Sequence, residues 1–188
     1  MTRKEQKEEK KRTILMTALR LFVERGFHET KISDIAAAVP MSVGLLFHYF
    51  ESKEVLLKEL VTMGVQYTSS VSKVPAKDPE AFFKMFLNQL FEFINTQPWV
   101  FNMFVLMGQA RKAGMPEDVR ELAEKVNTSE ELSKIIINGQ KSGAFREGDA
   151  LQLSITFLAA VQGIIEEMAV NKDYKAPDPD WIIAILLK

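Results

Sequence analysis

The sequence predicts an all-α protein, and two patterns lead to this prediction. Apolar residues recur every three or four positions along each long segment, whereas a half-buried strand would alternate apolar and polar residues. Proline and glycine stand between these segments, where they end helices. The 188 residues are 47% hydrophobic and 26% charged and include no cysteine, so the chain can bury a globular core without disulfides.

The first two helices have clear boundaries. The first carries an apolar stripe over residues 14–23 and ends at Gly26, because glycine is favoured just after a helix. Thr30 is the predicted N-cap of a short second helix, since its side-chain oxygen can accept a hydrogen bond from the first turn. Pro40 ends this helix because proline lacks a backbone N–H.

Two further helices follow in the N-terminal part. Ser42 caps a third helix, which carries Leu45, Leu46, Phe47, Tyr49 and Phe50. Ser52 caps a fourth, which is expected to run from about Lys53 toward Ser69–Ser70. Beyond it the same helical period predicts five more helices at about 79–96, 98–112, 117–142, 148–172 and 179–188, of which the third could be interrupted at Asn127–Ser129.

Charge is distributed unevenly along the chain. Residues 1–60 carry 11 Lys and Arg against 9 Asp and Glu, a net charge of +2, whereas residues 61–188 carry 13 against 16, a net charge of −3. A basic face near the N-terminus is compatible with site-specific binding of nucleic acid. The charged start does not fit a signal peptide, and no apolar run is long enough to span a membrane, so a cytoplasmic protein is expected.

Residues 32–36, a turn at Val39–Met41 and a helix opening at Ser42 have the spacing of a helix-turn-helix. Helical proteins also form such corners for structural reasons alone. Spacing by itself therefore leaves both interpretations open.

More specific residues surround this corner. They are Ala18-x-x-x-Phe22-x-x-x-Gly26-Phe27-x-x-Thr30, Asp34-Ile35-Ala36, Ser42-x-Gly44-x-Leu46-Phe47-x-Tyr49-Phe50 and Lys53-Glu54-x-Leu56. With them, about the first 57 residues resemble the TetR family of bacterial transcriptional regulators. The resemblance implies a helix-turn-helix DNA-binding domain over residues 1–52 and an effector-binding and dimerisation domain over residues 53–188, with the fourth helix as connector.

The family places its third helix in the major groove of double-stranded DNA. The DNA-binding residues that the resemblance implies are Lys31, Ser42, Val43, Gly44, Leu45, Phe47, His48, Tyr49 and Lys53. Gly44 lets the helix approach the duplex closely, and the hydroxyls of Ser42 and Tyr49 can donate to phosphate oxygens. This chain departs from the family at Pro40-Met41, which replaces the usual Gly-Val of the turn.

Aromatic and thioether side chains gather in residues 82–107, where seven Phe, three Met and Trp99 occupy 11 of 26 positions. Such side chains suit a pocket for an irregular apolar ligand, and they suit a helical core equally well. The resemblance favours the pocket, for which the candidate residues are Phe86, Met103, Phe104, Met107 and Phe157.

The segment 148–172 is apolar on more than one face and is expected to be buried on two sides. We expect it to form half of a four-helix interface between two copies of the chain. The predicted interface residues are Phe157, Val161, Ile164 and Met168.

The sequence contains no recognisable catalytic or metal-binding motif. The two histidines, His28 and His48, are 20 positions apart, and the adjacent Glu166 and Glu167 point in different directions on a helix. No catalytic residue, metal or cofactor is therefore predicted.

The resulting prediction is a ligand-responsive, homodimeric transcriptional repressor that a small apolar effector releases from a palindromic operator, with no membrane partner. Two alternatives are an enzyme that uses the aromatic-rich pocket and a helical protein-interaction module. Salt-dependent binding of specific duplex DNA distinguishes the repressor from the module.

Overall fold

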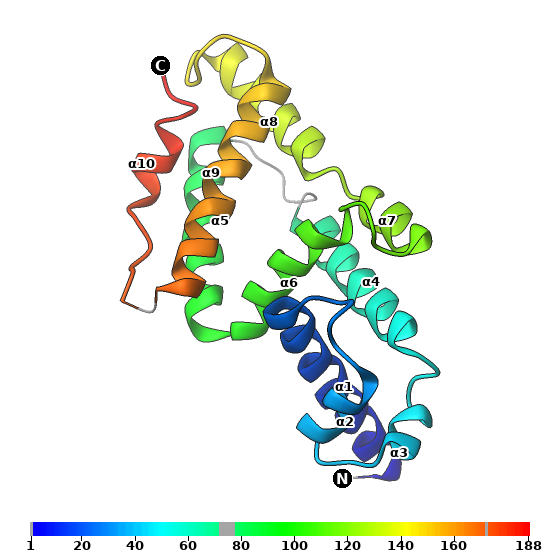
Figure 1. Cartoon of the computed structure of the whole chain (residues 1–188). Helices are drawn as coiled ribbons and strands as arrows, with labels where there is room; N and C mark the ends of the chain where they lie inside the picture. The colour runs from blue at the N-terminus through cyan, green and yellow to red at the C-terminus, as the bar shows by residue number, and fades with distance from the viewer. Residues whose placement is uncertain (1, 72–77, 172) are drawn as a thin grey trace. The chain divides into compact units, whose positions relative to one another are not determined.

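A computed structural model describes residues 2–71, 78–171 and 173–188, and each regular element in these ranges is a helix (Figure 1). The helices are α1 (Arg3–Arg25), α2 (Ile32–Ala38), α3 (Val43–Phe47), α4 (Lys53–Val71), α5 (Pro79–Thr96), α6 (Pro98–Ala110), α7 (Glu117–Glu124), α8 (Thr128–Ser142), α9 (Ala150–Val170) and α10 (Pro179–Ile183). A single isolated bridge joins Phe145 to Leu187 in the described part. The prediction of an all-α fold is confirmed, and none of the described helices is long and apolar enough to cross a membrane.

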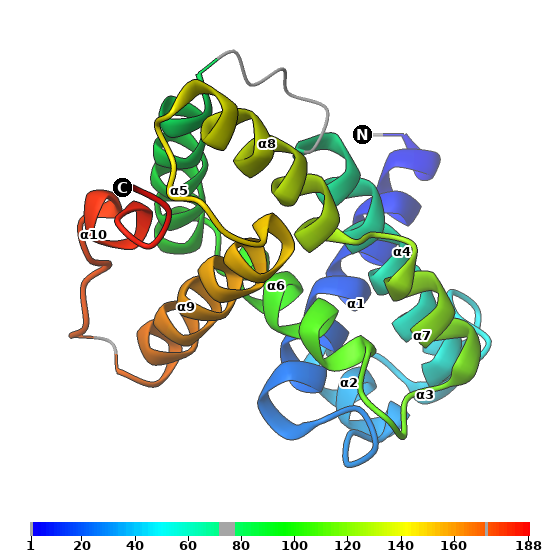
Figure 2. The ribbon, with the colours of Figure 1, turned by 90° about the horizontal axis from the view of Figure 1, so that it is seen from above.

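Packing divides the chain into two compact units. The first contains residues 1–67 and 98–125, and the second contains residues 68–97 and 126–188. Helices α6 and α7 therefore pack with the N-terminal helices, whereas α5 packs with α8 and α10, as Figure 2 shows for α5 beside α10. The predicted domains, 1–52 and 53–188, are divisions by function and remain a prediction. The two packing units have different bounds.

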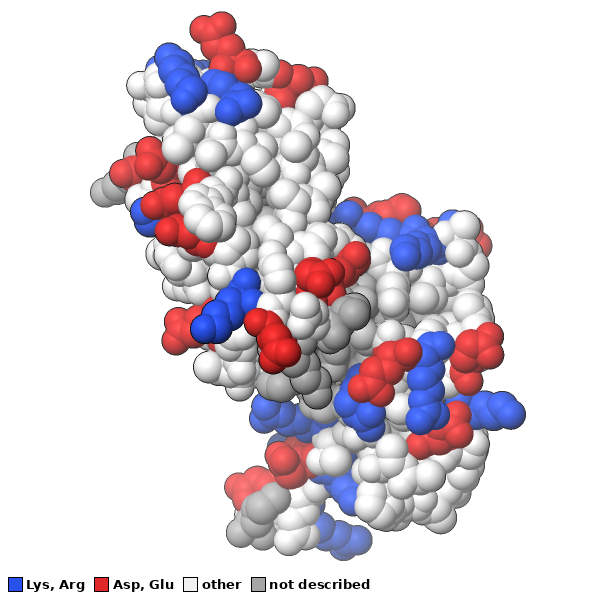
Figure 3. All heavy atoms as spheres, turned by 60° about the vertical axis from the view of Figure 1, so that its left-hand side comes forward, with Lys and Arg blue, Asp and Glu red and all other residues white. Residues whose placement is uncertain are grey.

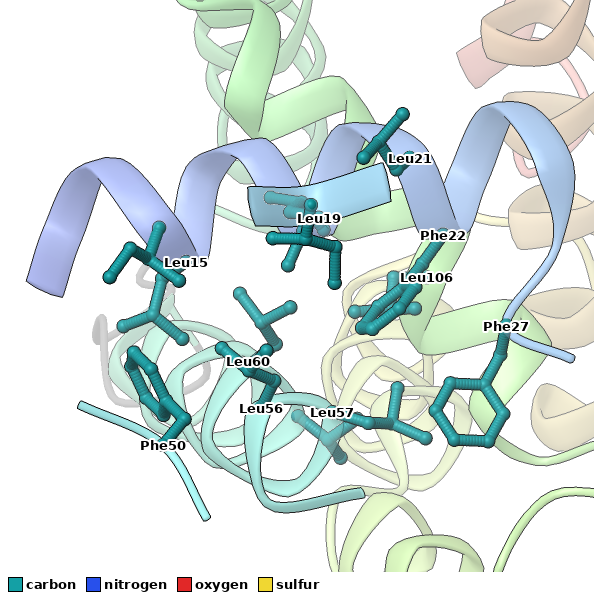
Figure 4. Close-up of a cluster of buried hydrophobic side chains, with 14 of the residues drawn as sticks. Leu15, Leu19, Leu21, Phe22, Phe27, Phe50, Leu56, Leu57, Leu60 and Leu106 are labelled. Carbon is teal, nitrogen blue, oxygen red and sulfur yellow. The ribbon is translucent and has the colours of Figure 1, made fainter. Parts of the chain in front are cut away.

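The core of the first unit forms where α1 crosses α4 (Figure 4). One face of α1 is buried along its second half, and Leu106 of α6 packs against the same cluster. The buried members from α1 and α4 are Ile14, Leu15, Ala18, Leu19, Leu21, Phe22, Leu56, Leu57, Leu60 and Val61. Burying each large apolar side chain contributes about 1.5–3 kcal/mol relative to exposure, so this crossing fixes the base on which α2 and α3 rest.

Helices α4 and α6 approach each other closely at Gly64. A Cβ atom added to Gly64 would collide with the side chain of Met107 and lie 3.0 Å from the sulfur of Met103. The missing side chain therefore makes room for the two methionines, and α6 is held against α4 in the first unit.

The second unit has an aromatic core. The ring of Phe83 in α5 lies 4.9 Å from that of Phe157 in α9 and 5.8 Å from that of Phe145, with edge-to-face geometry in both pairs. All three side chains are fully buried. These contacts join α5, α9 and the segment after α8.

The interruption that the sequence allows at Asn127–Ser129 is present: the segment 117–142 forms α7 and α8, and Asn127 caps α8 by accepting from Glu130 N–H at 3.3 Å. One predicted helix end is wrong. The segment 179–188 is helical only to Ile183. Beyond this residue, the Arg146 guanidinium donates hydrogen bonds to the carbonyls of Ala184 and Leu187, each at 2.9 Å. Sequence periodicity could not reveal this contact, which spans about forty residues.

Candidate nucleic-acid interface

The second helix begins with a cap that differs from the predicted one. Thr30 does not cap α2: its hydroxyl is buried and donates to the carbonyls of Gly26 at 2.8 Å and Leu21 at 3.2 Å, at the end of α1. Instead, the Asp34 carboxylate accepts from the backbone N–H of Lys31 at 2.9 Å. Thr30 thus fastens the corner between α1 and α2, and the side chain of Lys31 is exposed where α2 begins.

The turn between α2 and α3 contains Pro40, where the sequence has Pro40-Met41 in place of the Gly-Val that is usual in the family it resembles.

Helix α3 is short and is anchored from one side. The Ser42 hydroxyl accepts from Leu45 N–H at 3.1 Å, which confirms Ser42 as the cap of α3. Leu46 and Phe50 are buried and hold the helix and its following turn against the first unit. Because the anchors lie on one side, the other side of this five-residue helix faces outward.

The outward side carries most of the predicted DNA-binding residues. Gly44 and His48 are exposed, and Leu45 and Phe47 are 44% and 46% exposed. Val43 and Tyr49 are half-buried. A Cβ atom added to Gly44 would meet no protein atom within 4 Å, so open space lies over the helix at this position.

Lys53 has partners inside the protein. Its ammonium group donates to the carbonyls of Phe27 at 2.8 Å, Thr30 at 3.0 Å and His28 at 3.4 Å, and it lies 4.4 Å from the centre of the Phe27 ring. An ammonium has three N–H donors, and these contacts use all of them. The structure thus gives Lys53 a role in holding the α1–α2 corner against α4, where the sequence predicted a phosphate contact.

A second contact joins this corner to the loop after α6. The Nε2 atom of His28 lies 3.0 Å from the carbonyl oxygen of Gly114, and Lys58 of α4 pairs with Asp118 of α7 at 2.8 Å. The Lys58 ammonium lowers the pKa of the Asp118 carboxyl, chiefly through this hydrogen bond. Local sequence patterns indicate neither contact, since the partners lie 86 and 60 residues apart.

Comparison with known proteins bears on this helix-turn-helix. The family described as "Bacterial regulatory proteins, tetR family" matches residues 14–60. YuxN, a transcriptional regulator of Bacillus subtilis, is 29% identical over 126 residues, which cover 64% of this chain and 42% of YuxN. The chain thus matches less than half of the length of YuxN.

A longer match decides the family. YxaF, an HTH-type transcriptional regulator of Bacillus subtilis, is 30% identical over 168 residues that cover 85% of each chain. This chain belongs to the TetR family. The family and the relatives YuxN and YxaF are described as transcriptional regulators.

The fold of solved TetR regulators agrees along nearly the whole chain. The crystal structure of AibR in complex with isovaleryl coenzyme A and operator DNA covers 95% of this chain and 98% of its own, with a TM-score of 0.75 and 20% identity. At this identity the likeness concerns the fold. It extends the TetR fold beyond the matched residues 14–60 to the helices that follow.

The five predicted ligand residues of this TetR regulator are divided between the two units. Met103, Phe104 and Met107 belong to α6 in the first unit, where the two methionines pack over Gly64. Phe86 and Phe157 belong to the second unit, with ring centres 6.5 Å apart. The described contacts therefore place Met103 and Met107 in the hydrophobic cluster of the first unit, and Phe86 and Phe157 in the aromatic core of the second.

The predicted dimer-interface residues of α9 differ in their exposure within the single chain. Phe157 and Val161 have no exposed surface within the single chain, while Ile164 and Met168 are half-buried. The face of α9 that these residues share points into the second unit, where Phe157 meets Phe83. Sequence alone shows that α9 has two apolar faces and not which of them turns inward.

The opposite face of α9 is the exposed one. It carries Leu151, Ile155, Ala159 and Gly163, of which Ile155 is 43% exposed. No protein atom lies within 4 Å of a Cβ added to Gly163. On α10, Trp181 is 74% exposed, which is unusual for so large an apolar side chain.

Proposed function

We propose that this TetR regulator is a homodimeric repressor that inserts α3 of each protomer into the major groove of a palindromic operator. The exposure of Leu45 and Phe47 on α3 carries the proposal, because two large apolar side chains stand outward on a short capped helix beside an open glycine. Such side chains contact thymine methyl groups, and His48 can bond a base edge.

The phosphate contacts come from the residues around α3. The exposed Lys31 and the hydroxyls of Ser42 and Tyr49 can donate to the DNA backbone, which positions α3 without reading sequence. Lys53 acts in our proposal as a positioning residue, because its ammonium is engaged by three carbonyls of the α1–α2 corner.

Dimerisation is proposed on the exposed face of α9. Leu151 and Ile155 of this face, together with Trp181 of α10, supply apolar surface. The small residues Ala159 and Gly163 let a second α9 approach closely. In a two-fold interface the same patch meets itself. A dimer presents two copies of α3 and so favours an operator with two related half-sites.

A small apolar effector is proposed to act through α6. This helix carries Met103, Phe104 and Met107, and it packs against α1 in the same unit as the DNA-binding helices. A ligand that displaces the methionines from Gly64 would move α6 relative to α4. Repression then ends because the effector favours a state that binds operator less well. AibR, which has the same fold, was solved in complex with isovaleryl coenzyme A and operator DNA, so one protein of this fold binds both a small molecule and an operator.

Since the target is the bacterial chromosome, we place the regulator in the cytoplasm. Selection of duplexes from a random pool tests the proposal. The expected result is enrichment of a palindrome whose half-sites are centred about 10 base pairs apart or a multiple of this. Recovery of no preferred sequence would contradict the function.

A further inference from the structure

An open groove of about 560 Å³ lies between the N-terminal part of α1 and the segment formed by α3 and the turn that follows it. Its lining residues are Arg3, Gln6, Lys7, Lys10, Leu45, His48 and Tyr49. Three of them, Leu45, His48 and Tyr49, already belong to the proposed DNA interface. The other four come from the N-terminal end of α1.

The α1 side of the groove is part of a regular, capped helix. Thr2 caps α1 through a reciprocal pair of hydrogen bonds: its hydroxyl accepts from Glu5 N–H at 3.2 Å, and its own N–H donates to the Glu5 carboxylate at 2.7 Å. The helix therefore begins eleven residues before residue 14, where the match to the family begins. This wall is a feature of the present chain that the matched segment does not include.

The lining residues of α1 share one face. Residues 3, 6, 7 and 10 follow the spacing of neighbours on a helix surface, and the same row continues to Ile14 and Ala18, which are buried. One face of α1 thus changes from basic to apolar at residue 14. The apolar part packs on the core and fixes where the basic part points.

The groove carries positive charge without a compensating carboxylate. Arg3, Lys7 and Lys10 line it, no Asp or Glu does, and none of the three forms an ion pair with the rest of the described chain. Elsewhere on α1, Lys11 pairs with Glu59 at 2.6 Å. The face in Figure 3 likewise shows Lys and Arg interspersed with Asp and Glu. The groove therefore differs from these surfaces, where Lys and Arg lie among Asp and Glu.

We propose that this groove holds a stretch of DNA backbone beside the bases that α3 reads. The proposal rests on the proposed function and adds α1 as a second wall. Arg3 and Lys10 are separated by about 10 Å along the helix, and one DNA strand carries a phosphate about every 3.4 Å of duplex axis, so the row can meet two or three phosphates. Gln6 and the Tyr49 hydroxyl are additional donors to phosphate oxygens. The row fixes the angle of α3 in the major groove and raises affinity for every sequence alike.

The test compares two charge-matched double variants of the full chain. Lys7→Gln with Lys10→Gln removes two cations from the groove, and Lys4→Gln with Arg12→Gln removes two exposed cations of α1 that do not line it. Binding is measured against salt concentration, with one duplex selected by the wild-type protein and one of unrelated sequence. Circular dichroism and melting temperature verify the fold of each variant.

We expect the groove variant to reduce the slope of log affinity against log salt by about 0.9 for each phosphate that a protomer no longer neutralises, on both duplexes. The control variant should keep a slope close to that of the wild type. An unchanged slope in the groove variant, or an equal reduction in both variants, would overturn the groove proposal while leaving the proposed function intact. Failure of the wild-type protein to bind duplex DNA would instead overturn the function itself.

Discussion

At the scale of single residues, Lys53 shows how one side chain can hold a binding helix in place without touching the ligand. Its ammonium satisfies three carbonyls that follow α1, while the backbone of the same residue opens α4. The Ser52 hydroxyl accepts from Val55 N–H at 3.2 Å and caps that helix, as the sequence predicts. Two adjacent residues therefore join the α1–α2 corner to α4.

Replacing Lys53 with methionine tests this role, because methionine keeps the aliphatic stem and removes the three donors. Hydrogen bonds to a charged group typically contribute about 1.5–3 kcal/mol, so we expect the free energy of unfolding to fall by about 2 kcal/mol in urea titrations. The matched control, Lys31→Met, alters an exposed side chain and should leave stability nearly unchanged. If Lys53→Met were as stable as the wild type but bound DNA more weakly, the interpretation of Lys53 as a phosphate contact would be correct instead.

Ser154 is a second residue whose environment makes a prediction. Its side chain is fully buried in α9, and its hydroxyl has no hydrogen-bond partner in the described part of the chain. Because an unsatisfied buried hydroxyl is unfavourable and alanine is a better helix former, Ser154→Ala should stabilise the protein by about 1 kcal/mol. Thermal unfolding measures this change. A lower melting temperature would show that the hydroxyl has a partner.

At the scale of elements, the two apolar faces of α9 are expected to respond differently to charge. Ile155→Lys places a cation on the exposed face and should yield folded monomers, seen as the single-chain mass in light scattering with unchanged helix content. Val161→Lys places the same charge at a position with no exposed surface and should unfold the second unit. A folded dimer for Ile155→Lys would remove this face from the proposed interface.

Elements are predictable from the sequence where local chemistry decides them. Gly26, Ser42 and Ser52 end or begin helices as expected, because a cap depends on residues within a few positions. Thr30 departs from its predicted role because its hydroxyl has two acceptors at the end of α1 that spacing does not reveal. The end of α10 differs from the prediction for the same reason, since Arg146 is distant in sequence.

At the scale of the whole molecule, the grouping of helices could not be read from the order of the chain. Helices α6 and α7 belong to the same unit as α1–α3. Helix α5, which precedes α6 in the sequence, belongs to the second unit. The candidate DNA interface was predictable because its residues lie within one short stretch with a recognisable motif. The candidate ligand residues were less so, because Met103 and Phe157 share apolar character and belong to different units.

The central claim is that α3 enters the major groove, and Gly44 tests it most directly. Because no protein atom would meet a new side chain there, Gly44→Leu should leave the melting temperature nearly unchanged while it pushes α3 away from the duplex. Binding to the selected operator is measured for the wild type, Gly44→Ala and Gly44→Leu. We predict a graded loss of affinity, small for alanine and near complete for leucine. Wild-type affinity in a folded Gly44→Leu protein would contradict the account.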